Sequence, residues 1–131
     1  MDDYSIFIDF LSNNDFNLIE NRLPGLFVYG RGSFFIEIVQ ERGGRRFISL
    51  SATNKREPES WYDMQVVRFF ILKLNYDKND NVVRFKELST FFIEHFKEIA
   101  EAFNASHFSD TEEKLNALRK ERVRIEFGYN G

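Results

Sequence analysis

The side chains that could carry out chemistry are few and scattered along this chain. It contains two histidines, His95 and His107, and no cysteine. A zinc site needs three or four ligands close together, and neither histidine has a second histidine at helical spacing. Without cysteine, disulfide bonds and thiolate-bound metals are excluded. The sequence therefore predicts no metal centre, no cofactor and no catalytic residue.

Motifs for a nucleophile or for phosphate binding are also missing. No serine lies in a Gly-x-Ser-x-Gly sequence. Gly30-x-Gly32 and Gly43-Gly44 lack the spacing and the following helix of a phosphate-binding loop, so we interpret them as turns. Carboxylates are plentiful, but they lie on helix faces predicted to be solvated. A hydrolase is a distant hypothesis, which a deep pocket with two converging carboxylates would revive.

Length and composition narrow the class of protein. A chain of 131 residues has the usual size of a single domain, 1–131, and its net charge of −3 argues against broad binding to nucleic acid. No stretch approaches the roughly 20 apolar residues of a membrane span, and the acidic start lacks the features of a signal peptide. We therefore expect a cytoplasmic protein that binds neither membrane nor nucleic acid. The sixteen phenylalanines suit cores and contact surfaces rather than active sites.

Residues 4–14 are predicted to form a short helix. Four apolar residues share one helical face there, namely Tyr4, Phe7, Ile8 and Leu11. Asn13 and Asn14 follow as a stop signal. A strand is the competing interpretation, because Ile6, Ile8 and Phe10 alternate.

A run of short strands is predicted to follow the helix. The strands are expected at residues 16–22, 26–30, 33–41 and 45–51. The turns between them are Leu23-Pro24-Gly25, Gly30-Arg31-Gly32 and Gly43-Gly44. Phe34, Ile36 and Ile38 alternate with Glu37 in the third strand, which is typical of a half-buried sheet. Links this short predict an antiparallel meander of about four strands within residues 1–52.

Helical spacing governs residues 60–127. The helices are expected from Ser60 to Leu74, over 82–104, and from Ser109 onward. Ser60 with Asp63, and Ser109 with Glu112, have approximate capping-box spacing. The segment 122–127, RVRIEF, alternates like a strand as well, so its type stays open. The predicted fold is α+β, with a short N-terminal helix, the meander, and three C-terminal helices packed on one side of the sheet.

Candidate contact residues are one aromatic group and several acids. Trp61, Tyr62 and Asp63 lie where a polar stretch turns apolar, and we favour a helix start packed on the sheet edge. The alternative is an exposed binding patch, because Trp and Tyr are frequent at interface hot spots. The acidic candidates are Glu57, Glu59, Asp77, Asp80, Glu94, Glu98 and Glu101. On an outer helical layer they would form one negative surface that steers a basic partner.

The basic run at 119–124 and the histidine His95 are interpreted as structural features rather than as binding sites. The basic run RKERVR, 119–124, suits the end of a solvated helix, where cations complement the helix dipole. RNA contact is the alternative, but no stacking aromatic residues interleave the run. His95 lies on the edge of an apolar helix stripe, which is typical of a boundary residue.

Two segments carry a family resemblance. The first contributes Trp61, Tyr62, Asp63, Val67 and Arg68, and the second contributes Leu115, Leu118, Arg119, Glu121 and Arg122. Together with the order of elements, these segments resemble small bacterial immunity proteins of polymorphic-toxin and contact-dependent growth inhibition systems. The resemblance implies a non-enzymatic protein that binds one cognate toxin, such as a basic nuclease domain, and occludes its active site. It assigns no binding residues, because immunity surfaces differ between pairs.

A second class of function is the alternative. The chain would then be a small cytoplasmic regulatory or scaffold module that binds another cellular protein and has no relation to toxins. A gene far from any toxin or secretion locus would favour this alternative.

Overall fold

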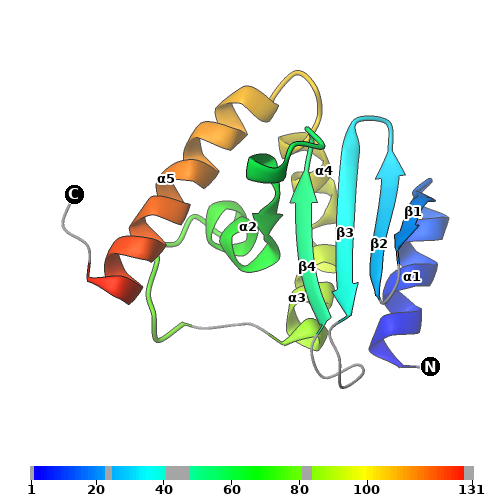
Figure 1. Ribbon diagram of the computed structural model, residues 1–131, viewed down its shortest axis with the longest axis horizontal. Helices are drawn as coiled ribbons and strands as arrows, with labels where there is room; N and C mark the ends of the chain where they lie inside the picture. The colour runs from blue at the N-terminus through cyan, green and yellow to red at the C-terminus, as the bar shows by residue number, and fades with distance from the viewer. Residues whose placement is uncertain (1, 23–24, 41–47, 81–83, 129–131) are drawn as a thin grey trace.

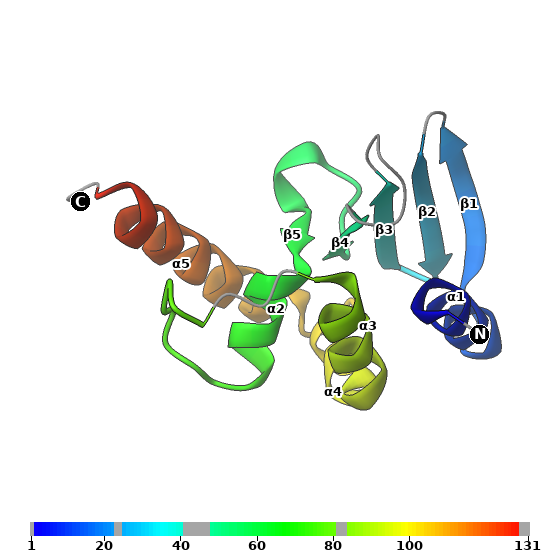
Figure 2. The same ribbon diagram turned by 90° about the horizontal axis from the view of Figure 1, so that it is seen from below.

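The computed structural model describes residues 2–22, 25–40, 48–80 and 84–128. Within these ranges, a helix precedes an antiparallel sheet and further helices pack on that sheet, so the predicted α+β class is confirmed (Figure 1). The first helix is α1 (Asp3–Asn13). Figures 1 and 2 place it at the opposite end of the molecule from the last helix, α5 (Phe108–Phe127).

Helix α1 forms because its apolar residues recur at helical spacing. Phe7 and Leu11 are fully buried, whereas Ile6 is 44 % exposed. A strand would bury Ile6 together with Phe10, so the strand interpretation of this segment is wrong. The side chain of Asp2 caps the helix by accepting a hydrogen bond of 2.8 Å from the backbone N–H of Ser5.

Five strands form the sheet in the order β1-β2-β3-β4-β5, and each is antiparallel to its neighbour. They are β1 (Asn17–Arg22), β2 (Leu26–Arg31), β3 (Phe34–Gln40), β4 (Ile48–Thr53) and β5 (Tyr62–Asp63). The sequence predicted four strands and missed β5, in which Tyr62 pairs with Ala52. β4 also runs two residues beyond its predicted end at Ser51. The predicted Gly43-Gly44 turn and most of the Leu23-Pro24-Gly25 turn lie outside the described residues.

Helix α2 (Met64–Ile71) begins later than predicted, because its N-cap is Asp63 and not Ser60. The Asp63 carboxylate accepts a hydrogen bond of 2.9 Å from the backbone N–H of Gln65. Ser60 instead ends a short 3-10 helix, Pro58–Ser60. The capping box predicted for Ser60 and Asp63 was therefore wrong.

The long helix predicted over 82–104 is two helices, α3 (Phe85–Glu94) and α4 (Phe96–Ala102), with His95 between them. Residues 82 and 83 lie outside the described part. The backbone N–H of His95 donates to the Phe91 carbonyl and the N–H of Ile99 donates to the His95 carbonyl, both at 3.0 Å. Helical hydrogen bonds thus flank the interruption, and the apolar period continues across it. Four helices, rather than three, follow the sheet in the described residues.

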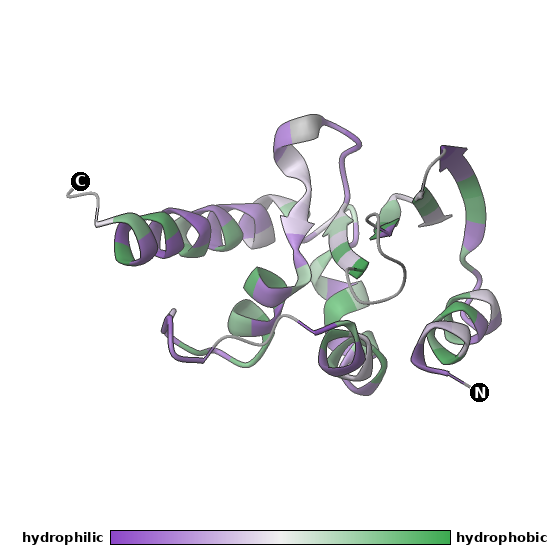
Figure 3. Ribbon diagram, turned by 60° about the horizontal axis from the view of Figure 1, so that its bottom comes forward, coloured by the Kyte–Doolittle hydropathy of each residue, from purple (hydrophilic) through white to green (hydrophobic). Residues whose placement is uncertain are grey.

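Helix α5 continues through residues 122–127, so that segment is a helix and not a strand. It ends at Gly128, whose φ of 70° suits a glycine in the left-handed conformation. At the other end the Asn104 side chain accepts a hydrogen bond of 2.8 Å from the backbone N–H of His107. The capping box predicted at Ser109 and Glu112 is therefore not the start of this helix. Figure 3 shows that hydrophilic residues predominate along α5.

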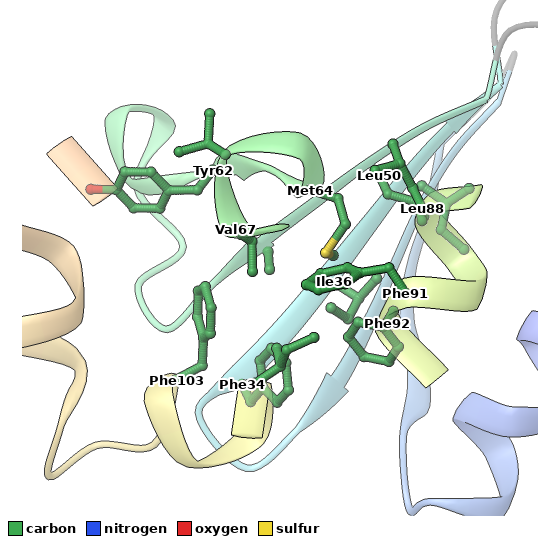
Figure 4. Close-up of a cluster of buried hydrophobic side chains, with 14 of the residues drawn as sticks. Phe34, Ile36, Leu50, Tyr62, Met64, Val67, Leu88, Phe91, Phe92 and Phe103 are labelled. Atoms are coloured by element: carbon green, nitrogen blue, oxygen red, sulfur yellow. The ribbon is translucent and has the colours of Figure 1, made fainter. Parts of the chain in front are cut away.

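A line of touching aromatic rings runs through the core. In order, its members are Phe7, Phe92, Phe34, Phe103, Phe108 and Tyr62, from α1, α3, β3, the end of α4, α5 and β5. Neighbouring ring centroids lie 5.2 to 6.5 Å apart, and each member is at most 5 % exposed. Figure 4 shows Phe34, Phe92 and Phe103 pointing toward one interior together with Met64 and Ile36. Ring contacts of this kind bury large area and fix orientation.

The helices cover only one face of the sheet. Figure 2 shows α1, α3 and α4 on one side, and the connection from β4 to β5 rising on the other side, which we call the outer face. Along β3 the buried residues Phe34, Ile36 and Ile38 alternate with half-buried ones, as the sequence predicted. Glu37 is one of the half-buried residues, so β3 presents this carboxylate on the outer face.

Replacing Phe92 by alanine tests the aromatic line. Phe92 is fully buried, so we expect Phe92→Ala to lower the free energy of unfolding by about 3–5 kcal/mol. The matched control is Phe127→Ala, since Phe127 is 68 % exposed and should change stability by less than ~0.5 kcal/mol. Urea unfolding measures both values. Equal losses from the two variants would contradict this account of the core.

Candidate functional site

A hollow of about 460 Å³ opens on the outer face of the sheet. Its lining consists of Glu20, Arg22, Val28, Glu37, Arg56 and Trp61. Strand register explains the grouping, because Glu20 pairs with Val28 and Val28 pairs with Glu37 across three strands. Val28, the middle residue of this row, is 1 % exposed. Trp61 and Arg56 come from the two ends of the connection between β4 and β5.

An ion network holds the connection onto the edge strand. One oxygen of Glu20 contacts Arg22 Nε at 2.7 Å and the other contacts Arg56 Nη2 at 2.8 Å. The Arg56 guanidinium carbon also lies 5.6 Å from the centroid of the Phe35 ring. Because Glu20 is in β1, these contacts tie the segment around Arg56 across the outer face. Each oxygen of the Glu20 carboxylate therefore contacts one arginine.

The Glu37 carboxylate differs from the Glu20 carboxylate in its hydrogen-bond partners. Among the described residues, no hydrogen bond or ion pair reaches the Glu37 carboxylate, although the residue is half-buried. Burial raises the pKa of Glu37; nearby Arg22 opposes this rise, and Glu20 adds to it. In the described part of the chain, this carboxyl group is thus partly desolvated and has no hydrogen-bond partner in the hollow. Carboxyls with perturbed pKa values in hollows are candidates for functional residues.

The predicted group of Trp61, Tyr62 and Asp63 is divided by strand β5. Trp61 is half-buried and lines the hollow. Tyr62 is 1 % exposed, so it is a core residue and no surface contact. Its hydroxyl donates a hydrogen bond of 2.8 Å to Asn116 Oδ1, and burial together with the Glu112 carboxylate raises the pKa of Tyr62. Of the predicted aromatic pair, only Trp61 faces the candidate site.

The two segments that carry the family resemblance contact each other. The Arg119 guanidinium lies 4.5 Å from the centroid of the Tyr62 ring, and Arg122 pairs with Asp63 at 3.6 Å. Arg119 also donates hydrogen bonds to the backbone carbonyls of Glu59 and Trp61, at 3.0 and 3.4 Å. These residues therefore attach α5 to β5 and to the connection before it. Their role in this structure is positional.

The basic run at 119–124 is largely engaged within the chain. Arg119 and Arg122 contact the β5 segment, and Arg124 pairs with Glu121. The run lies in the C-terminal half of α5, as predicted, but Arg119 and Arg122 are held against the β5 segment and are not simply solvated.

The acidic candidates do not gather on one surface. Glu57 and Glu59 are exposed on the connection between Arg56 and Trp61. In the loop after α2, Asp77 accepts a hydrogen bond of 2.9 Å from the Asn79 backbone and Asp80 pairs with Arg68 at 3.2 Å. Three more, Glu94, Glu98 and Glu101, are exposed on α3 and α4. His95, 31 % exposed, is a boundary residue as expected, and its ring contacts Glu98 at 3.3 Å.

A second hollow brings two of these acids together. It is a groove of about 910 Å³ between α2, α4 and α5. Phe70 and Leu118 contribute apolar lining, and its charged lining residues are Lys73, Glu98, Glu101, Asp110 and Lys114. Acids and lysines are mixed there, so the groove has no dominant sign of charge.

Sequence reasoning found Trp61 but missed Glu20, Arg22, Glu37 and Arg56. The alternation of Glu37 with buried residues placed it on the polar face of β3, and this was the available signal. Its grouping with Glu20 depends on strand register, which includes an irregularity between Leu18 and Glu20. The position of Arg56 depends on the path of the connection. Neither feature follows from residue type or spacing.

Comparisons of this chain with protein-family models, curated proteins and solved structures found no match. The resemblance to immunity proteins therefore stays a prediction. In the part of the chain that the structure describes, no group of three or more histidine, aspartate or glutamate residues could hold a metal ion. Over the same residues, no helix has the length and apolarity needed to cross a bilayer.

Glu37→Gln should stabilise the protein near pH 7. Because the pKa of Glu37 is raised on folding, the folded state binds its proton more tightly than the unfolded state does. The free energy of unfolding then falls as pH rises through this pKa, and glutamine removes that loss. We expect a gain below ~1 kcal/mol, since the group is only half-buried. The gain should vanish below about pH 4, where Glu37 of the unfolded chain is also protonated.

Urea unfolding of both proteins at pH 4 and pH 7 measures this difference. Glu113→Gln is the matched control, because Glu113 is exposed on α5. A loss of stability in Glu37→Gln at pH 7 would mean that the carboxylate is favourably paired in solution.

Proposed function

We propose that this chain is a cytoplasmic, non-enzymatic immunity protein. It binds a cognate bacterial toxin domain through the outer face of its sheet and occludes the active site of that toxin. The observation that supports the proposal best is the composition of the outer-face hollow. Trp61, Arg22 and Arg56 meet there, and tryptophan and arginine are enriched among residues that dominate protein interfaces.

The connection from β4 to β5 is suited to enter a concave active site. It projects from the outer face (Figure 2), and it carries the exposed carboxylates of Glu57 and Glu59. Arg119 holds its backbone at Glu59 and Trp61, and Thr53 Oγ1 donates a hydrogen bond of 2.6 Å to the Lys55 carbonyl. A segment that is ordered before binding loses less entropy in the complex. Its acids would also attract a basic nuclease domain and raise the rate of association.

A hydrolase is less well supported by the same hollow. Glu20 and Glu37 both line it, and a raised pKa suits Glu37 to a general acid. Glycoside hydrolysis also needs a second carboxylate that is free to act as base or nucleophile. Glu20 is bound by both Arg22 and Arg56, which leaves no such free group. The arrangement favours binding over bond cleavage.

Co-expression tests the proposal. The chain is expressed together with the toxin domain encoded immediately upstream of its gene, and we expect cells to survive. The double variant Glu57→Lys, Glu59→Lys reverses two exposed charges, so it should fold normally and bind the toxin domain at least ~10-fold more weakly. Glu113→Lys is the control, since it reverses an exposed charge on α5 and should bind as the unmodified chain does.

Continued cell death in the presence of the unmodified chain would reject the immunity function. Stable capture of a different cellular protein by the outer face would then favour the regulatory or scaffold alternative.

A further inference from the structure

The unequal pairing of the two carboxylates in the outer-face hollow points to a specific ligand group. We propose that this hollow receives an arginine side chain of the partner protein, whose guanidinium pairs with Glu37 while its stem and plane lie against Trp61. This inference rests on the proposed function, because it names the chemistry by which the partner is held.

Glu37 needs a cationic partner because the two arginines of the hollow contact Glu20 instead. The charges of Glu20, Glu37, Arg22 and Arg56 sum to zero. Both arginines nevertheless contact Glu20, at 2.7 and 2.8 Å, and Glu37 receives no hydrogen bond from the described residues. A half-buried carboxylate that the described residues leave without a donor is unfavourable, and an incoming donor with a positive charge removes that cost. A partner's carboxylate would instead have to displace Glu20 from two arginines.

Arginine fits the hollow better than lysine. The guanidinium is planar, binds a carboxylate through two N–H groups and stacks on an aromatic face. Trp61 lines the same hollow as Glu37, and tryptophan gives the strongest cation–π contacts. A hollow of about 460 Å³ leaves room for the whole side chain. The exposed acids Glu57 and Glu59 on the adjoining connection offset the added positive charge.

A titration with capped arginine, N-acetyl-L-arginine N-methylamide, tests the inference without any toxin. Carbon-13 NMR follows the side-chain carboxyl of Glu37, and proton NMR follows the indole N–H of Trp61. We expect saturable shifts at both groups and a fall of about one unit in the pKa of Glu37. The citrulline analogue, which has the same shape and no charge, should leave that pKa unchanged.

The inference is overturned if citrulline acts on Glu37 as strongly as arginine does. It is also overturned if the control carboxyl of Glu113 responds as much as Glu37. In the Glu37→Gln variant the Trp61 shift should be lost, and its full retention would likewise count against the site.

Binding of the toxin domain separates this inference from the proposed function. We expect Glu37→Gln to weaken that binding at least ~10-fold relative to Glu113→Gln, because a charge-assisted contact is lost. If the toxin domain binds both variants equally well, the arginine site is wrong and the immunity function stands. If capped arginine binds at Glu37 while no toxin domain binds the chain, the site stands and the immunity function is wrong.

Discussion

Contact between aromatic rings holds the helices to one face of the sheet, and the remaining features of the molecule depend on that packing. Phe34 in β3 is central, because its ring contacts Phe16, Phe92 and Phe103. Through these neighbours the N-terminal segment, α3 and α4 share one interior. Dispersion and burial at such contacts are the main source of stability in a small fold. With its apolar side chains turned to the helices, β3 places Glu37 on the opposite face.

The outer face combines the buried Val28 and the half-buried Phe35 and Trp61 with charged and polar contacts. Arg56 reaches from the β4–β5 connection to Glu20 in β1, and Arg119 reaches from α5 to the backbone of the same connection. The segment is thereby fixed at two points, although it contributes little to the core. Trp61 follows the connection at the start of β5 and lies in the hollow. A segment that is held in place before binding loses less entropy when a complex forms.

The sequence predicted the elements whose signals are local. Alternation at Phe34, Ile36 and Ile38 identified β3 and its buried face, and the spacing of Phe7 and Leu11 identified α1. Strand β5 was missed because it has two residues and pairs with β4 through contacts that are distant in sequence. The interruption at His95 was missed because the phenylalanines on either side keep the helical period. In the candidate site, residue type identified Trp61, whereas the grouping of Glu37 with Glu20 and Arg56 required strand register and the path of a connection.

Hydrogen–deuterium exchange of the chain with and without the upstream toxin domain tests most directly whether the outer face is the docking surface. We expect slower exchange in the complex over residues 54–61 and in β1, around Glu20 and Arg22. Exchange in α2, α4 and α5 should stay unchanged around the groove that they line. Slower exchange confined to that groove, or no slower exchange anywhere, would contradict docking at the outer face.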